Sequence, residues 1–116
     1  MRNDKDNVIV KKTFKFALEI VRFCELLEED RKYIVARQLL RAGTSIGANT
    51  REAQNAESKA DFIHKIKMAA KEADETEYWL SICRESENYP FNEGLFSELT
   101  EIIKILSKII SSSKND

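Results

Sequence analysis

The sequence predicts an all-α fold, an up-and-down antiparallel four-helix bundle that forms one domain over residues 1–116. The chain has 116 residues, which suits one hydrophobic core and is too short for two ordinary domains. It holds one proline and three glycines, so the turn punctuation of a β-rich fold is missing. Four segments repeat apolar residues at spacings of three and four, as amphipathic helices do. We expect helices at about 9–28, 32–56, 59–85 and 92–111.

The first helix, about 9–28, is predicted by two neighbouring apolar stripes that together make a wide helical face. One stripe comprises Val10, Phe14, Ala17, Val21 and Cys24, and the other comprises Ile9, Phe16, Ile20, Phe23 and Leu27. The charged stretch EEDRK at 28–32 then predicts a short turn. Like the apolar arcs of the other three helices, this face is wider than one bundle seam uses, which favours assembly with further copies of the chain.

The second helix, about 32–56, contains two interior glycines, Gly43 and Gly47, that could instead mark a loop. A seam of alternating four and three spacings runs through both glycines, and a loop would destroy its phase. The seam is Val35, Leu39, Ala42, Ile46, Asn49, Ala53 and Ala56. Two interior glycines cost about 2 kcal/mol of helix propensity relative to alanine, so packing must offset them. With Ala36, Leu40 and Thr50 they form a second stripe, which predicts close approach of a neighbouring helix; a kink or a ligand-binding notch is the alternative.

Asn49 is the polar member of that seam. A lone amide in an apolar seam can fix register or assembly state, or it can tie down a neighbouring backbone group. A ligand contact is the third interpretation.

The third helix, about 59–85, begins at a capping signal, because Ser58 is followed three residues later by Asp61. Its seam is Phe62, Ile66, Ala69, Ala73, Thr76, Leu80 and Cys83. Pro90 disfavours helix at Tyr89, and Asn92 is a suitable cap for the fourth helix, about 92–111. That helix repeats Leu95, Leu99, Ile102, Leu106 and Ile109, with Phe96, Ile103 and Ile110 beside them. The terminal SSSKND stretch is expected to fray.

Charge is unevenly distributed along the sequence. Residues 1–71 hold 15 Lys and Arg against 10 Asp and Glu, whereas residues 72–116 hold 4 against 10. Helices of opposite sign can neutralise each other within the bundle or between subunits. The alternative is a basic face for an anion such as nucleic acid.

Membrane and secretory segments are not expected, so we predict a cytoplasmic protein without a membrane partner. No apolar run approaches the ~20 residues that span a bilayer, and the start MRNDKDNVIV mixes both charge signs, unlike a signal peptide. Cys24 and Cys83 are isolated and lack CxxC spacing. Buried reduced thiols are therefore favoured over a disulfide, a zinc site or a nucleophile.

Two stretches, QLLRAGTSIGANTREA at 38–53 and SKADFIHKIKMAAKEADETEYWL at 58–80, resemble the family of 23S rRNA intervening-sequence proteins. The matching positions in the first stretch are Gln38, Leu39, Arg41, Ala42, Ser45, Ile46, Ala48, Asn49, Glu52 and Ala53. In the second they are Ser58, Asp61, Phe62, Lys65, Ala69, Lys71, Glu72, Ala73, Glu75, Thr76, Tyr78, Trp79 and Leu80. Thr50 and Met68 replace isoleucines of the pattern, and Ile66 replaces a leucine.

The resemblance implies a four-helix bundle that assembles with copies of itself into a ring of five. Some similar proteins are encoded within intervening sequences of rRNA genes, and the family looks similar to the nucleic-acid-binding accessory protein of diversity-generating retroelements. It implies no catalytic residue and no cofactor, and the biochemical role of the family is unsettled. A protein partner such as a reverse transcriptase is a further possibility.

An enzyme hypothesis depends on Glu72 and Glu75, which lie near two further acidic residues. Carboxylates on helices hold Mg²⁺ in all-helical nucleotide hydrolases, because hard cations take oxygen ligands. The second acidic motif of such a site is not evident, and the two carboxylates can equally be solvated or paired. A di-iron bundle needs two Glu-x-x-His motifs, whereas this chain has one histidine, His64, which we expect to be solvated. We therefore predict no catalytic, cofactor-binding or metal-binding residue.

A binding hypothesis has better geometry, because basic residues recur on outward faces. Arg37, Arg41 and Arg51 lie within about 80° of one another on the second helix. Lys11, Lys15 and Arg22 make a second stripe on the first helix, and Lys67 and Lys71 lie beside an outward-facing Tyr78 on the third. Such faces can pair with phosphates of RNA or DNA and stack a base.

Each of these features also has a structural interpretation. Exposed arginines often pair with acidic helices of another subunit, and a surplus aromatic face is more often an oligomer interface. The expected packing or oligomer contacts are Gly43, Gly47, Asn49, Tyr78 and Trp79. The sequence therefore leaves three functions open: a nucleic-acid-binding oligomer, an oligomeric scaffold or protein-partner adaptor, and, more remotely, the Mg-dependent hydrolase.

Overall fold

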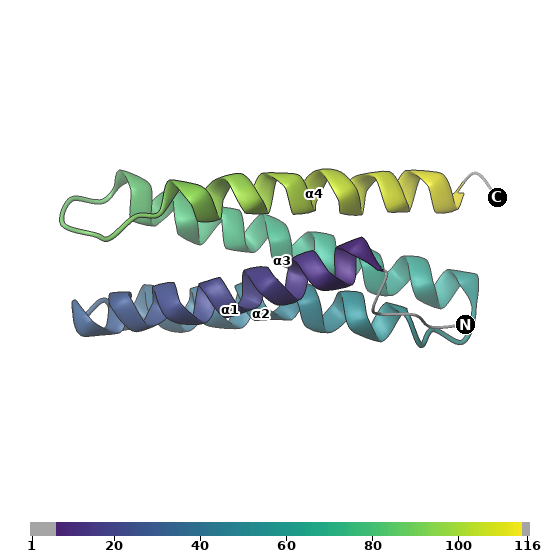
Figure 1. Cartoon of the computed structure of the whole chain (residues 1–116), viewed down its shortest axis with the longest axis horizontal. Coiled ribbons are helices and arrows are strands. Elements are labelled where there is room, and N and C mark those ends of the chain that lie inside the picture. The colour runs from purple at the N-terminus through teal and green to yellow at the C-terminus, as the bar shows by residue number, and fades with distance from the viewer. Residues whose placement is uncertain (1–6, 115–116) are drawn as a thin grey trace.

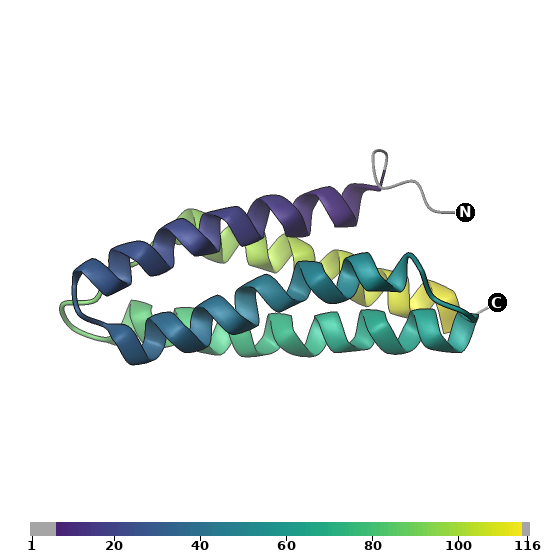
Figure 2. The same cartoon turned by 90° about the horizontal axis from the view of Figure 1, so that it is seen from below.

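Four helices make up the computed structural model, which describes residues 7–114 (Figure 1). They are α1 (Val8–Glu29), α2 (Tyr33–Ala53), α3 (Lys59–Glu85) and α4 (Glu93–Lys114). Each helix packs against the next along the chain, and α4 returns to α1, so the four close into an up-and-down bundle (Figure 2). No described segment is a strand. The all-α, four-helix fold class is confirmed.

The helix starts follow from caps that the sequence provides. Asn7 begins α1 by accepting a hydrogen bond from the Val10 amide at 3.2 Å. Ser58 begins α3 by accepting from the Asp61 amide at 3.0 Å, and Asn92 accepts from the Leu95 amide at 3.2 Å at the start of α4. These bonds satisfy amides that the first turn of a helix leaves without partners.

The helix ends differ from the expected ones in two places. α2 ends at Ala53 rather than near 56, because the Gln54, Asn55 and Ala56 amides bond three residues back in turns. α4 continues to Lys114, so the expected fraying is wrong for residues 111–114, while residues 115–116 lie outside the described part. Partial burial of Ile109, Ile110 and Ser113 ties this last stretch to the bundle.

The core is built from the buried members of the predicted seams of all four helices, and its fully buried large side chains include Phe16, Ile20, Leu39 and Leu99. Polar side chains within it bond to their own helices. The hydroxyls of Thr13, Thr50 and Thr76 donate to carbonyls four residues back at 2.7–2.8 Å. Among the described residues, no buried polar side-chain atom lacks a hydrogen-bond partner.

Gly43 and Gly47 face α1 at short range. A Cβ at Gly43 would lie 2.9 Å from both Cγ atoms of Ile20, and one at Gly47 would lie 3.2 Å from the backbone oxygen of Thr13. Such distances leave no ordinary room for a side chain, so the two glycines let α1 and α2 approach closely. α2 remains one continuous helix through both positions.

The tight turn between α1 and α2 places a non-glycine residue in the left-handed region, with Arg31 at φ 62°. The Arg31 amide donates to the Glu28 carbonyl at 2.9 Å, and the Lys32 amide donates to the Leu27 carbonyl at 2.8 Å. This pair of bonds is a Schellman motif, which usually has glycine at the position of Arg31. None of the described helices is long and apolar enough to cross a membrane.

Candidate interaction surfaces

Charge is separated along the length of the bundle. One end holds the start of α1, the connection from α2 to α3, and the end of α4 (Figure 1). The half of the molecule at this end, residues 7–18, 44–71 and 104–114, carries eleven Lys and Arg against three Asp and Glu. The other half, residues 19–43 and 72–103, carries six against fourteen. We call these the basic end and the acidic end; their formal charges are +8 and −8.

Most cations of the basic end are available to a partner. Lys11, Lys15, Lys67, Lys71, Lys104, Lys108 and Lys114 are exposed. Their side chains have no ion pair or hydrogen bond within residues 7–114. By contrast, Lys12 lies 3.3 Å from Glu101 of α4, and Lys65 lies 3.0 Å from Glu52 of α2. The unpaired set extends over α1, α3 and α4, so the positive potential belongs to the end of the bundle rather than to one helix.

Arg41, a predicted nucleic-acid contact, is already paired within the chain. Its guanidinium reaches from α2 to two carboxylates of α3, contacting Glu72 at 3.2 Å and also Glu75. The indole N–H of Trp79 donates to Glu75 at 3.2 Å, which completes the network. The hydrogen bonds from Arg41 and then Trp79 lower the pKa of the Glu75 carboxyl, and the bond to Glu75 raises the pKa of Arg41. The network links α2 to α3 and leaves less of this arginine for a phosphate.

The same pairing bears on the metal hypothesis. Glu72 and Glu75 share one guanidinium, and the structure describes no group of three or more His, Cys, Asp or Glu residues that could hold a metal ion. His64 is exposed. Cys24 and Cys83 are buried free thiols, and burial raises their pKa values to about 12 and about 11. A buried, protonated thiol is a poor nucleophile.

The other predicted cations lie at different places on the bundle. Arg51 belongs to the basic end, where its guanidinium lies 5.9 Å from the centre of the Phe14 ring. Arg37 and Arg22 are exposed but belong to the acidic end. The structure therefore brings Lys11, Lys15 and Arg51 to one end and separates them from the remaining three predicted cations.

The predicted packing residues are also distributed over more than one surface. Asn49 is half-buried, and its side-chain amide donates to the Ser45 carbonyl of its own helix at 3.0 Å. Tyr78 is exposed on α3 and meets the edge of Trp79 with ring centres 5.4 Å apart. Trp79 is half-buried against the core. Gly43 and Gly47 face α1, as described above.

An apolar surface remains uncovered on α1 and α2. On α1, the stripe of Ile9, Phe16, Ile20, Phe23 and Leu27 is buried. The neighbouring stripe, which contains Phe14 and Val21, is only partly buried. Phe14, Leu18 and Val21 are 54%, 46% and 39% exposed, and Leu40 on the neighbouring helix α2 is 40% exposed. We call these four residues the α1–α2 face. A row of large exposed apolar residues is typical of a protein contact.

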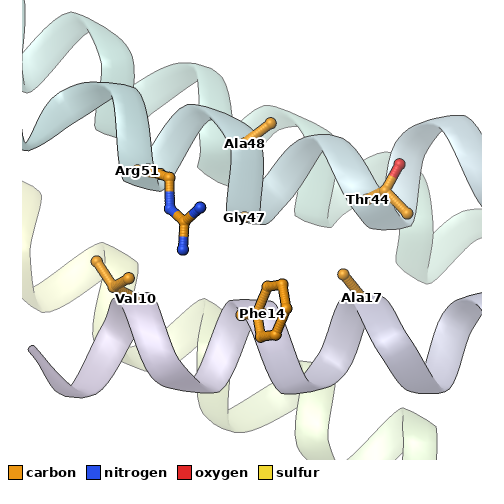
Figure 3. Close-up of a pocket in the computed structure, with 7 residues that line it drawn as sticks. All are labelled: Val10, Phe14, Ala17, Thr44, Gly47, Ala48 and Arg51. Carbon is orange, nitrogen blue, oxygen red and sulfur yellow. The ribbon is translucent and has the colours of Figure 1, made fainter. Parts of the chain in front are cut away.

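A groove of about 230 Å³ continues this face toward the basic end (Figure 3). It is lined by Val10, Phe14, Ala17, Thr44, Gly47, Ala48 and Arg51. Figure 3 shows the Arg51 side chain directed from α2 toward α1, with Phe14 and Ala17 on the opposite wall. The groove exists because Gly47 and Ala48 present almost no side chain there.

Sequence reasoning missed the axial arrangement of charge, although the counts were available. Charges were counted in the first and second parts of the sequence. In the bundle, however, antiparallel helices place the start of α1 beside the end of α4. Dividing each expected helix at its middle would have found the two ends. The free lysines Lys104 and Lys108 were missed for the same reason, since they lie in the acidic half of the sequence.

Comparison with known proteins agrees with this architecture. The sequence model of the family described as 23S rRNA-intervening sequence protein matches residues 5–112. Among solved structures, the chain is similar to a Bacteroides thetaiotaomicron protein of unknown function from the S23 ribosomal protein family. The two are 44% identical, the match covers 89% of this chain and 98% of that one, and the TM-score is 0.84. No curated protein matches. The chain belongs to the 23S rRNA intervening-sequence protein family.

Proposed function

We propose that this protein is a non-enzymatic, self-assembling helical protein that binds nucleic acid through its basic end. The observation that carries the proposal is the excess of eleven cations over three anions in one half of the bundle, with seven exposed lysines free of ion pairs among the described residues. Phosphate contacts from Lys and Arg supply most sequence-independent affinity for nucleic acid. The acidic end would repel the same phosphates, so binding is confined to one end.

Lys67, Lys71, Lys104 and Lys108 are the proposed phosphate contacts. They come from two neighbouring helices, α3 and α4, and all four are exposed. This set replaces Arg37 and Arg41 as the proposed contacts, because Arg37 lies at the acidic end and Arg41 is held by Glu72 and Glu75.

Tyr78 is a weaker candidate for base stacking than the sequence suggested. It lies in the acidic half of α3, one turn after Asp74 and next to Glu77. The negative charges of Asp74 and Glu77, so close to the ring in the helix, disfavour the approach of a phosphate backbone. Its exposed ring fits a protein contact better.

Self-assembly is supported by the α1–α2 face, which leaves three large apolar residues of α1 and one of α2 exposed. The resemblance noted above implies a ring of five copies. Assembly places several basic ends on one particle, which raises avidity for a chain of phosphates without a new contact. An oligomeric scaffold or protein-partner adaptor without nucleic acid is the second candidate, and the α1–α2 face alone favours it.

Single-stranded RNA binding at a series of salt concentrations tests the proposal. We expect log affinity to fall with log salt by about 0.7 for each neutralised phosphate. Changing Lys67 and Lys71 together to glutamine should flatten that slope by about 1.4 for each protomer engaged. The matched control is Arg37→Gln, an exposed cation of the acidic end, which should leave the slope unchanged.

The competing outcomes are distinct. Absence of wild-type binding at ~10 μM and low salt, a concentration at which non-specific binding is normally measurable, leaves the scaffold as the better hypothesis. Equal slopes for the wild type and the double lysine variant would remove α3 as the phosphate-binding surface. Light scattering on the same samples tests assembly independently, and a monomer at tens of micromolar would contradict it.

A further inference from the structure

An exposed seam on α1 has a charge pattern that is complementary to itself. Lys11, Phe14, Leu18, Val21 and Glu25 follow one another at alternating spacings of three and four, which places them along one side of the helix. All five are exposed, and they lie on the side of α1 opposite the buried Ile9, Phe16, Ile20 and Leu27. The spacing is that of a helix–helix contact, and the described part of the chain leaves it uncovered.

We propose that α1 of one copy packs antiparallel against α1 of a second copy, about a two-fold axis at Leu18. The proposal rests on the self-assembly proposed above and specifies one of its contacts. In this register Leu18 meets its own counterpart, and Phe14 lies opposite Val21 and Arg22 of the second copy. Lys11 and Glu25 are each seven residues from Leu18. At each end of the contact, Lys11 of one copy therefore lies opposite Glu25 of the other.

The charge of the whole molecule favours the same orientation. Antiparallel packing sets the +8 end of one bundle beside the −8 end of the other, whereas parallel packing of α1 on α1 sets like charges together. Along α1 itself, Lys11 and Lys15 lie toward the basic end, and Glu25, Glu28 and Glu29 lie toward the acidic end. The occupant with matching apolar and charged positions is therefore a second copy of this helix.

The contact uses the same patch on both partners. A closed ring of five instead needs two different patches that mate head to tail. The α1 contact therefore joins two single bundles into a dimer, and a ring of five copies would have to close through surfaces other than the α1–α2 face.

Cysteine cross-linking tests the register directly. Leu18→Cys should form a covalent dimer under mild oxidation, because the two residues meet at the axis. Lys11→Cys alone should not, since its two copies lie about 21 Å apart along the helices, but a mixture of Lys11→Cys with Glu25→Cys should cross-link. The unchanged protein, whose cysteines are buried, and Lys71→Cys on α3 are the controls.

A charge exchange provides the second test. Lys11→Glu or Glu25→Lys alone places like charges together at both ends of the contact, and we expect self-association to weaken about tenfold. The double variant Lys11→Glu/Glu25→Lys restores complementary charge and should restore association. A general loss of stability would not be reversed in this way.

The failures can be told apart. If Leu18→Cys does not cross-link while sizing still shows an oligomer, the α1 register is wrong and self-assembly stands. If the double charge variant associates no better than the single ones, the Lys11–Glu25 pairing is wrong. A monomer at tens of micromolar would overturn both this contact and the proposed assembly.

Discussion

Replacing Gly43 by alanine tests the close approach of α1 and α2. Alanine is the better helix former and gains about 1 kcal/mol of propensity over glycine. Its Cβ would lie 2.9 Å from both Cγ atoms of Ile20 and 3.1 Å from the Cδ1 atom. Ile20 is fully buried and branched at Cβ, so it has little freedom to turn away.

We expect the crowding to exceed the propensity gain. Overpacking a core costs about 1–3 kcal/mol, which leaves a net loss of roughly 1 kcal/mol for Gly43→Ala. That loss corresponds to a fall in Tm of about 4 °C for a chain of this size. Urea unfolding followed by circular dichroism at 222 nm measures it, with all proteins at one concentration because assembly contributes to apparent stability.

A double-mutant cycle identifies the cause. The Gly43→Ala/Ile20→Ala pair should be less destabilised than the two single changes added together, since the alanine at 43 occupies space that Ile20 vacates. Gly94→Ala is the control, because the nearest described atom to its Cβ would be the Oδ1 atom of the cap residue Asn92, at 3.2 Å, rather than a buried side chain of the core. Greater stability of Gly43→Ala than of the wild type would refute the close-packing explanation.

Three further changes probe other parts of the molecule. Arg31→Gly should stabilise the protein by about 1 kcal/mol, because Arg31 has φ 62°, a conformation that glycine adopts more easily. Arg37→Gly, which places glycine inside α2, should destabilise the protein by about as much. Urea unfolding measures both changes. Arg41→Gln should cost about 0.2–1 kcal/mol at neutral pH, as exposed ion pairs do. Arg41 lowers the pKa of Glu75 in the folded state. The stability that Arg41 contributes is therefore present above the ordinary carboxyl pKa of 4.5 and is lost as pH falls below that value. If the wild type were still more stable than Arg41→Gln at pH 2, the pairing would be contradicted. Cys24 and Cys83 should resist a thiol reagent at pH 8 in the native protein and react once it is unfolded, because burial raises both pKa values above 10; rapid native labelling would show that the core opens.

The helices could be predicted because the signals are local. Apolar spacing located all four, and the caps Ser58 and Asn92 located two of the starts. Gly43 and Gly47 were placed within a helix because the seam of α2 keeps its phase through them. The end of α2 was missed by three residues, since Ala56 matches the seam pattern but follows a turn at Gln54 and Asn55.

The candidate surfaces were less accessible to sequence reasoning because they depend on which helices are neighbours. The outward position of Arg41 was visible in the pattern, but its two partners on α3 were not assigned to it. The two stripes of α1 were both recognised, yet only packing decides that Ile20 is buried while Phe14 remains exposed. Leu18, which belongs to neither stripe, was missed. The basic end likewise arises only when the start of α1 and the end of α4 are placed together.

Lysine footprinting tests most directly whether nucleic acid binds at the basic end. Exposed lysines would be acetylated with and without single-stranded RNA at low salt, and the extent of modification at each would be compared by mass spectrometry. We expect RNA to protect Lys67, Lys71, Lys104 and Lys108. Lys32 is the half-buried reference at the acidic end, where it pairs with Asp30 and lies over the Tyr89 ring, and its modification should be the same with and without RNA. Protection of Lys32 without protection of Lys67 and Lys71, or no protection at any lysine under conditions where RNA is bound, would contradict binding at the basic end.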